Sequence, residues 1–225
     1  MCAQRRIALY GGTFDPVHVG HIEIAHSVSQ LFEIEKVIFI PAQMAPHKVG
    51  RPVTEPIHRY AMLALATQDD PPLTISTFEL DAPDRRYTVD TIAHFQRALG
   101  DETELFFIMG ADSWSEITTW REWERLLMMT NHIVVTRPGY DPTTSHVGAI
   151  SERVIDLRTT LECGGPTPNI FFTDAVMRDI SATRIRRLAS EGRTEELTEL
   201  LPKPVLEYIK KYGIYRELNE AKLNS

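Results

Sequence analysis

Short apolar, β-branched runs alternate with longer amphipathic stretches along most of the chain. The short runs are typical of strands, and the stretches between them are typical of helices. This alternation predicts βαβ units and an α/β fold with a parallel sheet. The run at 105–109 is apolar throughout, as expected for a central strand covered on both faces. We therefore expect strands at Arg6–Tyr10, Lys36–Pro41, Leu73–Ser76, Leu105–Met109, His132–Thr136 and Asn169–Thr173.

Three of the amphipathic stretches, 18–32, 55–68 and 88–99, place apolar residues on one stripe at helical spacing. Packing against the sheet accounts for such stripes without any ligand. In the second stretch the residues expected on the buried stripe are Ile57, Ala61, Ala64 and Leu65.

The last third of the chain is less regular. Residues 138–168 are rich in proline and glycine, which predicts irregular surface structure with one short regular segment near Val154–Leu157. Helices are expected from Ser181 onward, with a new start at Pro202 and Pro204. We expect one structural domain, with a core over 1–187 and C-terminal helices over 188–225 packed on it.

The composition excludes several classes of protein. A length of 225 residues suits one α/β domain, and a net charge of −7 argues against a nucleic-acid-binding protein. Cys2 and Cys163 do not form a C-x-x-C motif, so neither a disulfide framework nor a thiolate metal site is expected. We also expect no signal peptide, no membrane span and a reducing cytoplasm as the compartment.

The segment 9–21, Leu-Tyr-Gly-Gly-Thr-Phe-Asp-Pro-Val-His-Val-Gly-His, carries the strongest chemical signal. Gly11, Gly12 and Pro16 follow the first strand and are expected to turn the chain sharply. His18 and His21 then stand three residues apart at a helix start, on one face of its first turn. A helix N-terminus has free N–H groups and a partial positive charge, so the segment predicts a phosphate site. An ordinary strand–turn–helix with a capping histidine is the alternative.

Three other groups are candidates for ligand contacts. Ser181 is a good N-cap, and the helix after it carries Thr183, Arg184 and Arg186, which suit phosphate as well as solvent. Gly110 and Asp112 follow the apolar strand at 105–109, where a ligand contact and a helix cap are both reasonable. His47 and Lys48 follow the second strand, at the edge where α/β proteins bind ligands.

Two of these motifs resemble the signatures of the nucleotidylyltransferase superfamily. His18-Val19-Gly20-His21 matches its His-x-Gly-His motif, and residues 180–186 match Ile-Ser-x-Thr-x-x-Arg. The longer form Gly11–Pro16 resembles the bacterial nicotinate mononucleotide adenylyltransferases. The same branch is similar at Pro46-His47-Lys48, at Tyr87–Thr91, around Trp120 and at Arg137-Pro138-Gly139.

The resemblance implies a Rossmann-like nucleotidyltransferase fold and a site for two substrates, ATP and nicotinate mononucleotide. The implied catalytic residues are Thr13, His18, His21 and Arg186. The implied ATP-binding residues are Gly11, Gly12, Thr13, Phe14, His18, Gly20, His21, Gly110, Asp112, Ile180, Ser181, Thr183, Arg184 and Arg186. The implied pyridine-nucleotide residues are His47, Lys48, Tyr87, Thr88, Asp112, Trp120 and Arg137.

The implied reaction joins the two substrates to give nicotinate adenine dinucleotide and pyrophosphate, a step of NAD biosynthesis. Mg²⁺ is expected on the substrate phosphates, with no protein side chain as its ligand. Two positions depart from the branch, Ala45 for a proline and Arg86 for a serine, and the second leaves recognition of the pyridine carboxylate open. Nicotinamide mononucleotide, dual specificity, phosphopantetheine and a nucleotide-binding regulator without turnover are alternatives, and a homodimer is left open.

Overall fold

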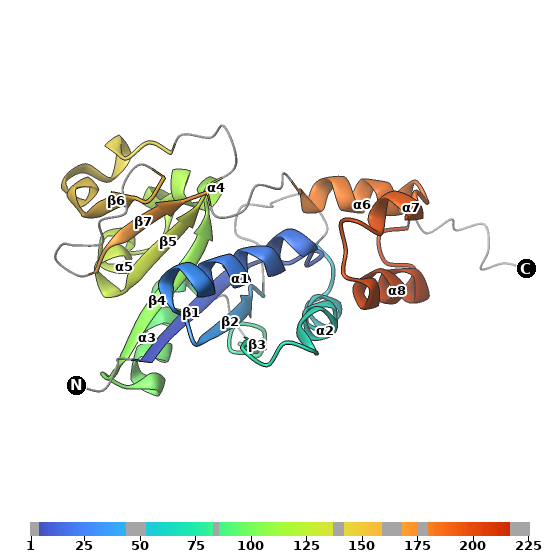
Figure 1. Ribbon diagram of the computed structural model, residues 1–225, viewed down its shortest axis with the longest axis horizontal. Helices are drawn as coiled ribbons and strands as arrows, with labels where there is room; N and C mark the ends of the chain where they lie inside the picture. The colour runs from blue at the N-terminus through green and yellow to red at the C-terminus, as the bar shows by residue number, and fades with distance from the viewer. Residues whose placement is uncertain are drawn as a thin grey trace, which may run out of the picture.

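The computed structural model describes residues 5–43, 53–82, 86–136, 142–158, 168–174 and 180–216. Its centre is a seven-stranded sheet in the order β3-β2-β1-β4-β5-β7-β6, in which all neighbours pair in parallel (Figure 1). The strands are β1 (Arg5–Gly12), β2 (Lys36–Pro41), β3 (Leu73–Ile75), β4 (Thr103–Gly110), β5 (Asn131–Val135), β6 (Val154–Asp156) and β7 (Ile170–Thr173).

Helices connect the strands and cover both faces of the sheet. They are α1 (Val19–Phe32), α2 (Pro56–Thr67), α3 (Thr88–Leu99), α4 (Ala111–Ser115), η1 (Ile117–Thr119), α5 (Trp123–Met129), η2 (Ser145–Arg153), α6 (Ala182–Ser190), α7 (Thr194–Leu197) and α8 (Lys203–Tyr212). Among the described residues, no helix combines the length and the apolar character that crossing a bilayer requires. The parallel sheet with helices on both faces confirms the expected Rossmann-like α/β architecture.

Alternation along the central strands divides the core into two layers. Ala8 of β1 and Ile108 of β4 face one side, where α1, α2, α6 and α8 pack. Leu9 of β1 and Phe107 of β4 face the other side, where α3, α4 and α5 pack. Because successive side chains point to opposite faces, a strand covered on both faces must be apolar at every position. This explains the continuous apolar run at 105–109.

The C-terminal helices lie together beside α2, at one end of the molecule (Figure 1). The Tyr208 hydroxyl of α8 lies 2.9 Å from Nδ1 of His58 on α2. The backbone N–H of Val19, at the start of α1, donates to the carbonyl of Leu200 at 3.0 Å. The C-terminal part of the chain therefore contacts the segment that begins the first helix.

Two local predictions are wrong. Ile57 of the expected α2 stripe is 64% exposed, and the buried face carries Arg59, Met62 and Leu63 instead. Of the residues expected to turn the chain after β1, Gly11 and Gly12 do not, because β1 extends through Gly12, whereas Pro16 does lie in a turn. The left-handed residue is Phe14, with φ of 50°. In α2, Arg59 thus occupies a buried position that the apolar pattern assigned to other residues.

Candidate functional site

Two cavities lie at the carboxyl ends of β1 and β4, next to each other in the sheet. The strand order continues from β1 to β2 and β3 on one side and from β4 to β5 on the other. Ligands of open α/β sheets bind in the crevice where the order reverses in this way. Gly11 and Gly12 end β1, and both line both cavities. The two sites therefore share one wall.

The first cavity, which we call the histidine cavity, has a volume of about 190 Å³. It combines the end of β1, the first turn of α1 and the start of α4. Its lining residues are Tyr10, Gly11, Gly12, Phe14, His18, Gly20, His21, Ile24, Gly110, Ala111, Asp112, Val135, Thr136 and Ile180.

The second cavity, which we call the tryptophan cavity, has a volume of about 480 Å³. It lies on the side of the sheet covered by α3. Its lining residues are Gly11, Gly12, Thr13, Ile40, Ala42, Glu79, Arg86, Tyr87, Thr88, Phe107, Met109, Ser113, Thr119, Trp120 and Arg121.

Close packing explains the glycines between the cavities. A Cβ on Gly11 would lie 2.9 Å from Cζ of Phe107, and a Cβ on Gly12 would lie 2.9 Å from Cζ of Phe14. Neither glycine has a positive φ. The glycines are needed because aromatic rings press on the backbone, and the thin wall lets ligands in the two cavities approach each other.

His18 and His21 form a stacked pair at the start of α1. His18 is the N-cap, and its backbone N–H donates to Nδ1 of His21 at 3.2 Å. The imidazole centroids lie 3.7 Å apart with a 26° tilt. Because Nδ1 of His21 accepts a hydrogen bond, the neutral ring carries its proton on Nε2 and can donate it to an anion.

The surroundings of His21 keep its ring neutral. Tyr10 and Phe14 approach it edge-on, with centroids 6.1 and 5.1 Å away. Burial, and secondarily the charge of His18, lowers the pKa of His21 well below its usual value. Before a ligand binds, His21 therefore supplies a hydrogen-bond donor rather than a full charge.

A buried arginine holds the segment between β1 and α1. The Arg59 side chain is fully buried, and its Nη1 donates to the carbonyl of Thr13 at 2.9 Å. Its other nitrogens donate to the carbonyls of Thr54 at 2.9 Å and Gln43 at 3.1 Å. Arg59 therefore ties the loop after β1 to the segments before and after the loop that follows β2.

Asp15 connects this loop to the C-terminal third of the chain. Its carboxylate accepts from the Tyr215 hydroxyl at 2.7 Å, and its carbonyl accepts from Nη1 of Arg186 at 2.7 Å. Arg186 also donates to the hydroxyl of Thr183 at 3.1 Å. Two residues far along the sequence thus fix the backbone that precedes the histidine pair.

The N-terminus of α6 lies beside the histidine cavity. Ile180 lines that cavity, and its Cδ1 lies 3.7 Å from the point that a Cβ on Gly20 would occupy. Ser181 is the N-cap of α6, and its hydroxyl accepts from the backbone N–H of Arg184 at 3.1 Å. The start of α6 is therefore next to the histidine cavity, although Ser181 and the arginines of the helix do not line it.

Comparison with known proteins identifies the family. Residues 9–188 match the cytidylyltransferase-like family. A probable nicotinate-nucleotide adenylyltransferase of Thermoanaerobacter sp. is 40% identical over 216 residues, 96% of each chain. A probable nicotinate-nucleotide adenylyltransferase of Thermus thermophilus is 38% identical over 94% of this chain and 100% of its own.

The chain belongs to the cytidylyltransferase-like family. A structure of Plasmodium falciparum nicotinic acid mononucleotide adenylyltransferase complexed with NaAD has a similar fold, with a TM-score of 0.70 at 18% identity. That alignment covers 94% of this chain and 97% of the other. The family assignment extends over the two cavities and the first turn of α6.

In this cytidylyltransferase-like chain the structure brings most of the predicted site residues together. The glycines, Phe14, both histidines, Asp112 and Ile180 line the histidine cavity, while Thr13, Tyr87, Thr88 and Trp120 line the tryptophan cavity. Ser181, Thr183, Arg184 and Arg186 lie on or next to the first turn of α6. His47, Lys48 and Arg137 lie outside the described residues.

Several site residues were not predicted from the sequence. Glu79, Ser113 and Arg121 line the tryptophan cavity, and Arg59 supports the loop that borders it. The only sequence signal for additional residues in this cavity was the replacement of a serine by Arg86, which also lines it. The others are single polar residues without a motif.

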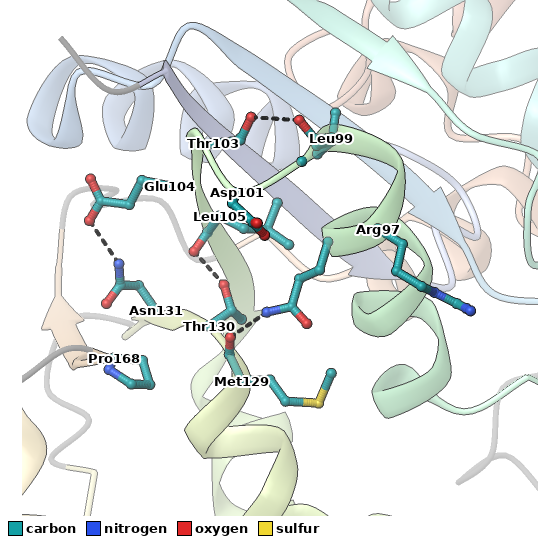
Figure 2. Close-up of a pocket in the computed structure, with 12 residues that line it drawn as sticks. Arg97, Leu99, Asp101, Thr103, Glu104, Leu105, Met129, Thr130, Asn131 and Pro168 are labelled. Carbon is teal, nitrogen blue, oxygen red and sulfur yellow. Dashed lines mark hydrogen bonds between the residues drawn. The ribbon is translucent and has the colours of Figure 1, made fainter. Parts of the chain in front are cut away.

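A third cavity of about 560 Å³ lies at the opposite edge of the sheet (Figure 2). Its polar groups bind one another: Thr130 donates to the carbonyl of Leu105, and Asn131 donates to Glu104 at 2.9 Å. Glu104 is also paired with Arg6 at 2.8 Å. These interactions join the amino ends of β1, β4 and β5, so we interpret this cavity as part of the scaffold.

Proposed function

We propose that this protein transfers the adenylyl group of ATP to nicotinate mononucleotide, forming nicotinate adenine dinucleotide and pyrophosphate. The observation that carries the proposal is the shared glycine wall between the histidine cavity and the tryptophan cavity. One side suits a polyphosphate and the other suits an aromatic ring. The names of the relatives support this pair of substrates over phosphopantetheine.

In this proposal ATP lies against the histidine cavity. The imidazoles of His18 and His21 and the N-terminus of α1 donate hydrogen bonds to phosphate oxygens. Gly110 and Asp112, at the carboxyl end of β4, contact the ribose. Ser181, Thr183, Arg184 and Arg186 hold the β- and γ-phosphates from the first turn of α6.

Nicotinate mononucleotide occupies the tryptophan cavity. Trp120 stacks on the pyridine ring, and Tyr87 and Thr88 contact the ring substituent near the start of α3. Thr13 and the backbone of Gly12 orient the phosphate of this substrate. We further propose that His47, Lys48 and Arg137 contact the substrate phosphates.

The chemistry follows from the positions of the two substrates. A phosphate oxygen of nicotinate mononucleotide attacks the α-phosphorus of ATP across the glycine wall. A new P–O bond forms, the bond between the α-phosphorus and the bridging oxygen breaks, and pyrophosphate leaves with the electron pair. Catalysis then consists of positioning and stabilisation of charge, with no covalent enzyme intermediate.

Magnesium fits this arrangement as a companion of the substrate phosphates. Among the described residues, no group of three histidine, cysteine, aspartate or glutamate side chains is placed to hold a metal ion. The Asp15 carboxylate near the site already accepts from Tyr215. When bound, the ion would neutralise phosphate charge.

We place the reaction in the cytoplasm, because the sequence has two cysteines and no C-x-x-C motif.

The test is a coupled pyrophosphate assay with ATP and a panel of acceptors: nicotinate mononucleotide, nicotinamide mononucleotide, phosphopantetheine and no acceptor. We expect release that depends on nicotinate mononucleotide. Release with phosphopantetheine alone would assign the protein to another reaction. ATP binding without release for any acceptor would instead support a nucleotide-binding regulator.

A further inference from the structure

Arg86 lies just before α3 and lines the tryptophan cavity. Its guanidinium carbon lies 4.0 Å from the centroid of the Phe78 ring. The His94 ring stacks on the same phenyl group, with centroids 3.9 Å apart and a 15° tilt. Two groups at these distances must occupy opposite faces, so Phe78 lies between Arg86 and His94. Stacking on a supported ring limits where the Arg86 charge can lie.

The charged groups that line this cavity are predominantly positive. Arg86 and Arg121 are the cations, and Glu79 is the acid. Burial raises the pKa of Glu79, against the opposing effects of its hydrogen bond from Thr91 and the charge of Arg86. Thr91 donates to this carboxylate at 2.7 Å, so Glu79 is directed toward α3.

The two arginines differ in their neighbours. The Arg121 guanidinium lies 4.8 Å from the Tyr87 ring centroid, and its Nε lies 3.6 Å from a carboxylate oxygen of Glu122. Part of its charge is therefore balanced by the adjacent residue on the surface. Arg86 lies against Phe78, and its charge acts on Glu79, which also lines the cavity.

We infer that Arg86 determines the preference of this enzyme for a pyridine carboxylate over a carboxamide. The inference rests on the proposed function and adds a residue that selects the acceptor. The two pyridine mononucleotides have nearly the same shape and differ by one negative charge on the ring substituent. A fixed cation beside the ring attracts the acid and gains nothing from the neutral amide, so charge rather than shape supplies the discrimination.

The experiment compares the wild-type protein with Arg86→Ser, Arg86→Lys and the control Arg5→Ser. Arg5 is exposed at the opposite edge of the sheet, where it pairs with Glu35 at 3.1 Å, so its replacement removes the same charge outside the site. For each protein, kcat/KM is measured with nicotinate and nicotinamide mononucleotides, and KM is measured for ATP.

We expect Arg86→Ser to lower kcat/KM for the acid about tenfold, the size of one charge-assisted hydrogen bond, with little change for the amide. KM for ATP should stay the same. Arg86→Lys should recover most of the acid preference, and Arg5→Ser should keep all of it. Added salt should weaken the preference in the wild type but not in Arg86→Ser.

An unchanged ratio of acid to amide in a folded Arg86→Ser protein would overturn the inference while leaving the proposed function intact. An equal fall for both substrates would do the same, since it would assign Arg86 to the architecture of the cavity. A wild-type protein inactive on both pyridine mononucleotides would instead overturn the proposed function and the inference together.

Discussion

At the scale of single residues, His21 connects the start of α1 to the histidine cavity. Its Nδ1 is occupied by the backbone N–H of His18, and its ring packs against both Tyr10 and Phe14. These contacts fix the orientation of the ring, so its Nε2–H is already positioned as a hydrogen-bond donor. Such preorganised donors act where charge develops during phosphoryl transfer.

His21→Ala should lower kcat/KM about 100-fold, because removing one donor of this kind costs roughly 3 kcal/mol of transition-state stabilisation. Steady-state pyrophosphate release measures the effect. His26→Ala is the matched control, since His26 lies on the same helix but is exposed and pairs with Asp70 at 2.9 Å. Near-native turnover of a folded His21→Ala protein would contradict the role given to this histidine.

Trp120→Ala tests the second cavity. We expect KM for nicotinate mononucleotide to rise about tenfold or more, the usual value of aromatic stacking, while KM for ATP changes little. Trp123→Ala is the control. Like Trp120, Trp123 packs against the core on the α3 side of the sheet, but it does not line the cavity. Equal increases in both KM values would indicate general damage rather than loss of a stacking partner.

At the scale of elements, the loop between β1 and α1 is held by parts of the chain far from it in sequence. Arg59 of α2 binds the carbonyl of Thr13, while Arg186 of α6 and Tyr215 after α8 bind Asp15. The helices at the C-terminus therefore do more than cover α2. They also fix the backbone of the segment that precedes His18.

Tyr215→Phe should destabilise the protein by about 1–2 kcal/mol, since Asp15 is buried and loses a hydrogen-bond donor. KM for ATP should rise severalfold because the loop before His18 is less restrained. Urea unfolding and steady-state kinetics measure the two effects. Tyr212→Phe is the control, since Tyr212 is exposed on α8. Loss of stability without any change in KM would show that the contact is structural only.

At the scale of the whole molecule, the sheet buries a titratable residue away from the site. His132 on β5 is fully buried, and burial lowers its pKa to about 4. An unfolded histidine has a pKa of about 6.5. Between these values the unfolded chain binds a proton that the folded protein does not. The free energy of unfolding therefore decreases as the pH falls from about 6.5 to about 4.

Replacing His132 by leucine should remove this contribution. We expect the difference in unfolding free energy between wild type and His132→Leu to shift against the wild type by roughly 3 kcal/mol between pH 7 and pH 4. Urea unfolding at a series of pH values measures it. Comparing the slopes separates titration from any change in packing. A difference independent of pH would mean that His132 is protonated equally in both states.

The sequence alone determined the α/β class, the positions of most strands and the first turn of α1, because these depend on local alternation and on the residues at a helix start. Residues 36–41 became a strand at the predicted bounds, and His18 and His21 came together as expected for residues three apart on a helix. The chemistry proposed for them comes from the same short motif. Local patterns persist wherever neighbouring residues supply most of the constraint.

Only the tertiary structure decided which distant residues complete the site. No periodicity indicates that Arg59 is buried, that Tyr215 binds Asp15 or that Arg86 stacks on Phe78. Each of these contacts depends on elements that meet only after the sheet has assembled. The sequence around a charged residue does not show whether its side chain will face solvent or a backbone carbonyl. The family motifs indicate a catalytic corner, whereas the folded chain determines what supports it.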